Sequence, residues 1–210
     1  MSVNLVKGQK VNLSKQRNGL SKVMVGLGWK EVKSQTFSNV SSGFSFDDDS
    51  IDCDAIAFLL DNNGKIAKKE DVVYFSNLEH FTGCVVHQGD NLTGNDNGMD
   101  AEQIMINLSR LPAEYERIII LVSIYDATIK KQHFGMIQNA YMRLVDAETN
   151  NELCIYNLSE NYDGMTSLVF GEIYRSSEGW KYNAIGQPLK IWSIAQLAEK
   201  YGLRRYALGR

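Results

Sequence analysis

Short segments of strand length recur along the whole chain and restrict the folds that it can adopt. Each is an apolar run or an alternation of apolar and polar residues, bounded by turns roughly every 8–12 residues. The most apolar segment, Arg117–Tyr125, is expected in the middle of a sheet. The other expected strands are 10–14, 22–29, 55–60, 72–75, 84–87, 104–108, 140–145, 152–158, 167–175 and 180–186. This pattern predicts an all-β fold, a two-sheet β-sandwich.

One segment near the end of the chain has the periodicity of a helix instead. Between Ile191 and Tyr201, apolar residues recur at i, i+3 and i+4. Gly202 follows, where a C-cap glycine belongs. The sandwich is therefore expected to carry a C-terminal helix. No Pro- or Ser-rich linker divides the chain, so residues 1–210 are predicted to form a single domain.

Charge and composition exclude several classes of protein. A net charge of -3 gives no broad basic surface for nucleic acid. The longest apolar run, Ile118–Val122, is far shorter than the ~20 residues of a transmembrane helix. Met1–Gly8 lacks the basic and then apolar order of a signal peptide. Three widely spaced cysteines without a CxxC pair favour free thiols and a cytoplasmic protein.

The segment from Gly89 to Glu102 is acidic and has neither a helical nor a strand pattern. It contains three Asp, three Asn, one Glu and three Gly, so its backbone can turn tightly and its side chains offer many oxygen atoms. Hard cations such as Ca²⁺ bind about 6–8 oxygens of this kind. An ordinary solvated loop is the alternative, because Asn, Asp and Gly are common in turns. Strand-like flanks exclude an EF-hand.

A second acidic segment, Asp47–Asp54, leads directly into the expected strand at 55–60. Asp52 and Asp54 are two residues apart on an extended chain, so their side chains point the same way. A charged strand end that faces water is the alternative. Because loops at one end of a sandwich can converge, the two acidic segments can meet and then require a divalent cation. The carboxylates that would meet are Asp52, Asp54, Asp90, Asp100 and Glu102.

No catalytic constellation stands out in the sequence. The three histidines, His80, His87 and His133, lack the close spacing of a transition-metal site. No serine lies in a GxSxG turn, and no P-loop is present. We therefore expect no enzymatic activity.

Several motifs resemble the tellurium-resistance TerD family. The most specific is the family's GDNxTG loop, which stands here as Gly89-Asp90-Asn91-Leu92-Thr93-Gly94. The remaining motifs, in chain order, are 5–13, 26–29, 52–60, 86–88, 107–113, 134–135, 139–141, 170–175 and 180–186. Together they cover nearly the whole chain with the family's order and similar spacing.

The resemblance implies a cytoplasmic bacterial β-sandwich that binds one or two Ca²⁺ ions through its two acidic segments. By position, the implied ligands are Asp52, Asp54, Asp90, Asn91, Asp100 and Glu102. The second segment departs from the family's TGxGxGDDE pattern, since it is one residue longer and Ala101 replaces the middle carboxylate. Asp96, which lies in the region of uncertain register, is added as a candidate that compensates for this loss. Lys30 stands where the family often has Asp.

The resemblance also implies a role in tellurite resistance or the general stress response. We expect a Ca²⁺-dependent binding or scaffold module whose partners are proteins of a stress complex. Two alternatives stay open. One is a metal-dependent enzyme that acts on a phosphorylated or nucleotide-like substrate. The other is a scaffold subunit of a membrane-associated stress complex with no small-molecule role.

Overall fold

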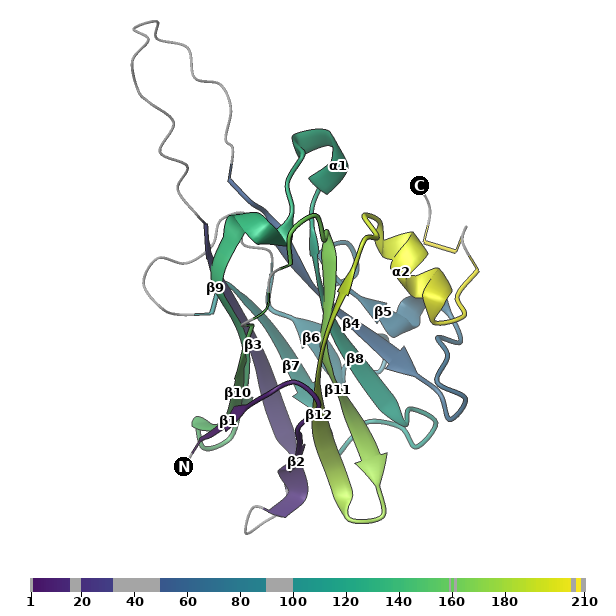
Figure 1. The fold of residues 1–210 in the computed structure, drawn as a ribbon. Coiled ribbons are helices and arrows are strands. Elements are labelled where there is room, and N and C mark those ends of the chain that lie inside the picture. Colours follow the sequence, from purple (N-terminus) through teal and green to yellow (C-terminus); the bar gives the residue numbers. More distant parts are fainter. Residues whose placement is uncertain are drawn as a thin grey trace, which may run out of the picture.

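The computed structural model describes residues 2–15, 20–31, 50–89, 100–158, 160, 162–204 and 207–208. Its strands form two six-stranded sheets that pack face to face (Figure 1). The first sheet has the order β1 (Val3–Leu5), β10 (Asn151–Asn157), β9 (Ile137–Asp146), β3 (Lys22–Glu31), β7 (Glu102–Asn107) and β6 (Val85–His87). The second sheet has the order β2 (Lys10–Asn12), β12 (Gly179–Leu189), β11 (Ser167–Ser176), β8 (Arg117–Ile124), β4 (Cys53–Leu60) and β5 (Val72–Val73). The predicted β-sandwich is confirmed.

Antiparallel pairing dominates among these strands. Within the described part of the chain, the exception is β1, which pairs in parallel with β10. The sequence does not predict β1, because three residues are too few to show alternation. Its register is set instead by β10, which comes from the opposite half of the chain.

The middle of the second sheet is buried on both faces. Every residue of β4 is buried. Cys53 and Ala55 face the first sheet, whereas Ile56 and Phe58 face the opposite side. A strand covered on both sides reads as a continuous apolar run, which is the pattern seen in the sequence. The prediction of a central strand at Arg117–Tyr125 holds for the same reason, since β8 lies between β11 and β4.

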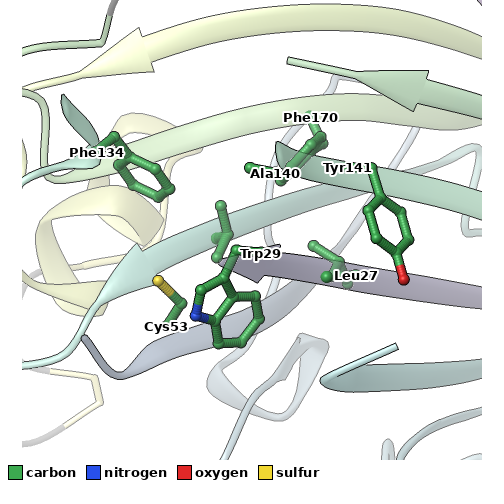
Figure 2. Close-up of a pocket in the computed structure, with 9 residues that line it drawn as sticks. Leu27, Trp29, Cys53, Phe134, Ala140, Tyr141 and Phe170 are labelled. Carbon is green, nitrogen blue, oxygen red and sulfur yellow. The ribbon is translucent and has the colours of Figure 1, made fainter. Parts of the chain in front are cut away.

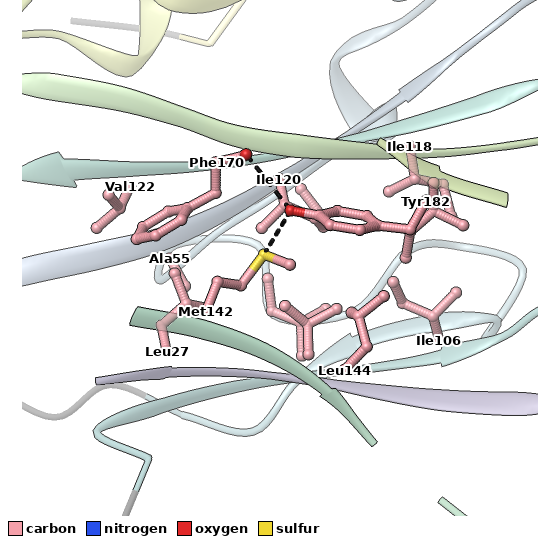
Figure 3. Packing of buried hydrophobic residues seen from close by; sticks show 14 of the residues in the cluster. Leu27, Ala55, Ile106, Ile118, Ile120, Val122, Met142, Leu144, Phe170 and Tyr182 are labelled. Atoms are coloured by element: carbon pink, nitrogen blue, oxygen red, sulfur yellow. Dashed lines mark hydrogen bonds between the residues drawn. The ribbon is translucent and has the colours of Figure 1, made fainter. Parts of the chain in front are cut away.

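The core between the sheets is organised around Tyr182, which is fully buried (Figure 3). Its hydroxyl lies within hydrogen-bond distance of two acceptors, the carbonyl of Phe170 at 3.4 Å and Sδ of Met142 at 3.7 Å. Met142 belongs to the first sheet, so this phenol joins the two layers. A side chain at Gly171 would collide with the Tyr182 hydroxyl, and β11 shifts register at this point against both neighbours.

The C-terminal helix α2 (Ile194–Lys200) packs on the outer face of the second sheet, beside β4 and β5 (Figure 1). Its presence is confirmed, but it begins three residues later than the periodicity indicates. The carbonyl of Ile191 accepts hydrogen bonds from the hydroxyls of Thr166 and Ser167, which keeps this residue outside the helix. Ser193 is the N-cap, and its hydroxyl accepts from the N–H of Gln196 at 3.2 Å.

Several short helical turns connect the strands. Between β8 and β9 lie α1 (Ala127–Lys130) and the 3-10 helix η3 (Phe134–Met136), which the pattern of the sequence does not predict. One turn of helix is too short to show periodicity. Two further 3-10 helices are η1 (Leu13–Lys15) and η2 (Lys69–Asp71). No helix in the described residues is long and apolar enough to span a membrane.

Candidate functional site

The predicted metal ligands divide between described and undescribed residues. Asp90, Asn91 and Asp96 lie outside the residues that the structure describes. The other four candidates, Asp52, Asp54, Asp100 and Glu102, are all buried, with exposed fractions of 8%, 4%, 9% and 1%. Buried carboxylates need hydrogen bonds or a compensating charge, so the surroundings of each decide what it can do.

Asp54 belongs to a buried polar row at the end of the second sheet. Because Cys53 and Ala55 face the first sheet, Asp54 points to the same side as Ile56. It lies opposite Ser123 on β8, which lies opposite Ser167 on β11. The hydroxyl oxygens of Ser167 and Ser123 lie 3.3 Å apart, within hydrogen-bond distance. This row joins the first acidic segment to the strands beneath α2.

Asp52 directly precedes β4. Its carbonyl accepts a hydrogen bond from the N–H of Tyr125 at 2.8 Å, so the pairing of β4 with β8 continues one step beyond the strand. By alternation Asp52 is on the same side as Asp54. The predicted common direction of these two side chains therefore agrees with the backbone of the structure.

Glu102 lies at the inner side of the first sheet, where β7 begins. Its Oε2 accepts the backbone N–H of Ala55 at 3.1 Å, across the gap to the second sheet. Nε2 of His87 lies 2.9 Å from the same oxygen, at ion-pair distance but outside the angle of a good hydrogen bond. Both side chains are almost completely buried. The structure therefore brings Glu102 to the end of the first acidic segment, as the convergence hypothesis requires.

Asp100 lies on the opposite face of the first sheet. Its Oδ1 accepts from Nε of Arg143 at 2.8 Å and from the Tyr141 hydroxyl at 3.2 Å. Its Oδ2 accepts from Nη2 of Arg143 at 2.9 Å and from the Gln103 amide at 3.2 Å. The carboxylate covers Gly26, where any side chain would collide with it. Asp100 and Glu102, two residues apart, thus belong to separate networks.

Contact with Asp100 shifts the pKa values of two neighbouring side chains. Hydrogen bonds to Asp100 raise the pKa of Arg143 above its usual value. Burial, followed by the negative charge of Asp100, raises the pKa of Tyr141 to about 12. The tyrosine therefore stays protonated at neutral pH and remains a hydrogen-bond donor.

The described residues do not complete a metal site by themselves. Among them, no three His, Cys, Asp or Glu side chains form a group that could hold a metal ion. The cavity beside Cys53 is also too small for an organic ligand. It is lined by Leu27, Trp29, Phe134 and neighbouring apolar side chains (Figure 2), and its volume of about 10 Å³ holds at most one water molecule.

His87, Tyr141 and Arg143 contact the candidate carboxylates but were not predicted from the sequence. Alternation within β6 indicates that His87 is buried, because it shares a face with Val85. A buried histidine needs a polar partner. Arg143 had a weaker signal, a single charge within an otherwise alternating apolar strand. Neither pattern names the carboxylate that the side chain contacts.

Comparisons with known proteins agree with the fold and the motifs. The chain matches the TerD domain over residues 1–201. It is 44% identical over 203 residues to stress response protein SCP2 of Bacillus subtilis (strain 168), covering 96% of this chain and 100% of that protein. It is 38% identical over 203 residues to tellurium resistance protein TerD of Serratia marcescens, covering 97% of this chain and 98% of that protein.

The solved structure of a homologue of telluride resistance protein (TerD) from Streptomyces coelicolor A3(2) has the same fold. Its TM-score is 0.63 at 19% identity, and the match covers 89% of this chain and 100% of that chain. The family match over nearly the whole sequence confirms the resemblance seen in the motifs. The chain belongs to the TerD family.

Proposed function

We propose that this chain is a stress-response and tellurium-resistance protein that acts as a Ca²⁺-dependent binding or scaffold module. Relatives named as stress response and tellurium resistance proteins, at 44% and 38% identity, support the physiological role. The metal rests on one structural observation: Glu102, at the end of the second acidic segment, hydrogen-bonds to Ala55, directly after Asp54 of the first. Carboxylates from two distant acidic segments are thereby buried at one end of the sandwich.

The available donors fit a hard cation in their chemistry, because all are carboxylate or amide oxygens. Among the described residues, Glu102 would hold the ion from the inner side, and Asp52 and Asp54, which point to the side of Ile56, would have to turn toward it. These three need further donors, and the proposal takes them from the segment between Gly89 and Asp100. The proposed additional ligands are Asp90, Asn91 and Asp96. A bound cation would neutralise the carboxylates and hold the two acidic segments together.

Asp100 fits the metal less well than the sequence predicts. Each of its oxygens already accepts two hydrogen bonds, which fills the lone-pair positions of a carboxylate. Ligation by Asp100 would require Arg143 to withdraw. One ion held by the remaining candidates is therefore better supported than two.

The proposed compartment is the cytoplasm, and the proposed partners are proteins of a stress complex that recognise the ordered acidic segments. Cys53, Cys84 and Cys154 are free and buried, which is compatible with a reducing compartment. Affinity capture with and without Ca²⁺ should recover such partners in the presence of the ion.

Isothermal titration with Ca²⁺ tests the metal directly. Asp54→Asn and Glu102→Gln should each weaken binding by at least about tenfold, because each removes a charged ligand. Glu114→Gln is the matched control, since it removes one exposed carboxylate near the opposite end of β8 and should leave Kd unchanged. A wild-type protein that takes up no Ca²⁺, or three variants with equal losses, would contradict the proposal.

The alternative function, an enzyme acting on a phosphorylated or nucleotide-like substrate, requires a place for the substrate beside the metal. The cavity next to Cys53 holds about 10 Å³, far less than a nucleotide occupies. Titration of the Ca²⁺-loaded protein with a nucleotide and with a sugar phosphate separates the two functions. Heat of binding that disappears in Glu102→Gln would favour the enzyme.

A further inference from the structure

We propose that a groove on the outer side of the second sheet binds an acidic, extended segment of a partner protein. The groove lies between η2 on one side and Arg204 and Leu208, which follow α2, on the other. None of the residues that line it belongs to either acidic segment. The inference therefore gives the chain a second interaction surface, which contains no proposed metal ligand and does not depend on Ca²⁺.

Two joined lobes make up the groove, and they meet at Lys69 and Glu70. Their volumes are about 460 and 490 Å³, within the range of ligand sites in proteins. One lobe is lined by Tyr74 and Leu208, which are uncharged, and the other by Arg204 and further cations. A space with two different ends suits an extended chain that has a charged part and an apolar part.

Positive charge dominates the lining of the groove. Lys68, Lys69 and Arg204 are exposed, and within the described part of the chain none of the three forms an ion pair. Among the residues that line the groove, Glu70 is the one carboxylate. An excess of positive charge is thus gathered on a chain whose net charge is -3. Such a local field attracts acidic partners.

Backbone hydrogen bonds hold both walls of the groove in place. Asp71, the last residue of η2, is fully buried, and its Oδ2 accepts the N–H groups of Ala67 and Lys68 at 3.2 and 3.0 Å. The N–H of Ile66 donates to the carbonyl of Tyr201 at 2.8 Å, which joins the segment before η2 to the end of α2. The groove is therefore formed before a partner binds, which lowers the entropic cost of binding.

The same contacts favour a peptide over a phosphate group as the occupant. Phosphate sites commonly present several backbone N–H groups to the phosphate oxygens, but those of Ala67 and Lys68 already bond to Asp71. The cations that remain are separate side chains, which suit carboxylates spaced along a chain. Tyr74 and Leu208 offer contacts to apolar side chains at the other end. We therefore expect a segment of several acidic residues followed by apolar ones.

Fluorescence anisotropy with a labelled peptide of four glutamates followed by two leucines tests the groove. The wild type should bind this peptide, with an affinity that falls as salt is added, and should not bind the matching peptide of four glutamines and two leucines. The double variant Lys69→Glu/Arg204→Glu should weaken binding by at least about tenfold, because it places like charges opposite the glutamates. A wild type that binds neither peptide, or both equally, would overturn the inference.

The matched control is Lys130→Glu/Lys131→Glu. It reverses two exposed lysines and changes the net charge by the same amount, but α1 and the residue after it lie outside the groove. The affinity for the glutamate peptide should therefore be unchanged. An equal loss in the two double variants would mean that net charge alone attracts the peptide, and the groove would be refuted.

Two further results separate this inference from the proposed function. The glutamate peptide should bind equally well in chelator and in Ca²⁺, and this binding supports the groove even if the wild type takes up no Ca²⁺. Peptide binding that requires Ca²⁺ would assign the peptide to the acidic segments and overturn the inference. Displacement of the peptide by inorganic triphosphate, at a lower concentration than unlabelled peptide needs, would also overturn it, because the groove would then favour a phosphorylated ligand.

Discussion

Replacement of Arg143 by methionine should destabilise the protein more than loss of any exposed ion pair. The guanidinium donates to both oxygens of Asp100, at 2.8 and 2.9 Å, and the Asp100 side chain has no exposed surface. Methionine retains the apolar stem of arginine but none of its donors. The carboxylate would then remain buried with Tyr141 and Gln103 as its described partners.

The magnitude follows from the burial of the pair. Breaking a buried ion pair by removing one partner costs about 3–5 kcal/mol. Arg143 is itself 31% exposed, so water can enter where the guanidinium lay, and the lower end of the range, about 3 kcal/mol, applies. For a chain of this size, each kcal/mol lowers Tm by roughly 2–4 °C. The expected decrease is therefore about 6–12 °C.

A double-mutant cycle with Asp100→Asn isolates the interaction. Thermal and urea unfolding of the wild type, both single variants and the double variant should give a coupling free energy above about 1 kcal/mol. The control is Arg117→Met. Arg117 and Glu172 form an ion pair at 3.0 Å in which the arginine side chain is 46% exposed, and such a pair is expected to contribute less than about 1 kcal/mol. Equal losses for the two arginines, or additive effects in the cycle, would refute the reasoning.

The same variant tests whether Asp100 is a ligand. If it ligates Ca²⁺, as the sequence predicts, removal of Arg143 frees the carboxylate and Kd decreases. The structure places Asp100 on the far face of the first sheet, so we expect titration to give an unchanged Kd.

The remaining predictions concern the metal, pH and packing. At a free concentration of 100 times Kd, Ca²⁺ should stabilise the fold by about 2.7 kcal/mol and raise Tm by about 5–10 °C, whereas Mg²⁺ should raise Tm much less. Thermal melts in chelator, in Ca²⁺ and in Mg²⁺ measure both effects. Identical melts in chelator and in Ca²⁺ would contradict the proposed Ca²⁺ site. Asp90→Ala should weaken Ca²⁺ binding more than Asp96→Ala in isothermal titration, and the reverse order would mean that the register of the segment is misjudged. Burial alone would raise the pKa of Asp71, but hydrogen bonds from His80, Tyr115 and the Lys68 backbone outweigh it and hold that pKa below its usual value. Its contribution to stability is thus complete above the unfolded pKa of about 3.9 and is lost as pH falls through the lower folded pKa, so urea unfolding should show a steeper acid loss in the wild type than in Asp71→Asn. Gly171→Ala should lower Tm strongly, because the added methyl collides with the Tyr182 hydroxyl and the Asn183 carbonyl; an unchanged Tm would contradict the packing around Tyr182.

Much of the sandwich could be predicted because strand formation leaves a local trace in the sequence. The continuous apolar run of β8 and the alternation in β9 are visible without knowledge of the neighbours. The start of α2 could not be predicted in this way. It depends on hydroxyls of Thr166 and Ser167 that lie 25 and 24 residues before Ile191. The single turn of α1 is likewise too short to leave a periodic signal.

The approach of Glu102 to the first acidic segment was predictable from the sequence, but its contacts were not. Asp52, Asp54 and Glu102 come to one end of the sandwich, and convergence of loops at such an end is a general property of the fold. The partners of Glu102 were not visible, and they change an expectation. From the sequence, Glu102→Gln should leave the metal-free Tm unchanged or slightly higher through relief of repulsion. Because the Ala55 N–H bonds to the carboxylate and the buried His87 ring lies 2.9 Å from it, we expect the metal-free Tm to fall.

The placement of Asp100 shows why spacing alone misleads here. Residues that are two positions apart on a regular strand point to the same face, and this rule would place Asp100 beside Glu102. However, β7 begins only at Glu102, and before it the chain is free to follow the strongest available partner. That partner is Arg143, 43 residues later, which Gly26 allows to approach because it has no side chain. The result is that each end of the 90–99 segment is held by its own network, Gly89 through His87 on the inner side and Asp100 through Arg143 on the outer side. Because both ends are anchored by protein contacts, a cation bound between them has little of the flanking backbone left to order. Its stabilising effect should therefore come mainly from neutralising carboxylates.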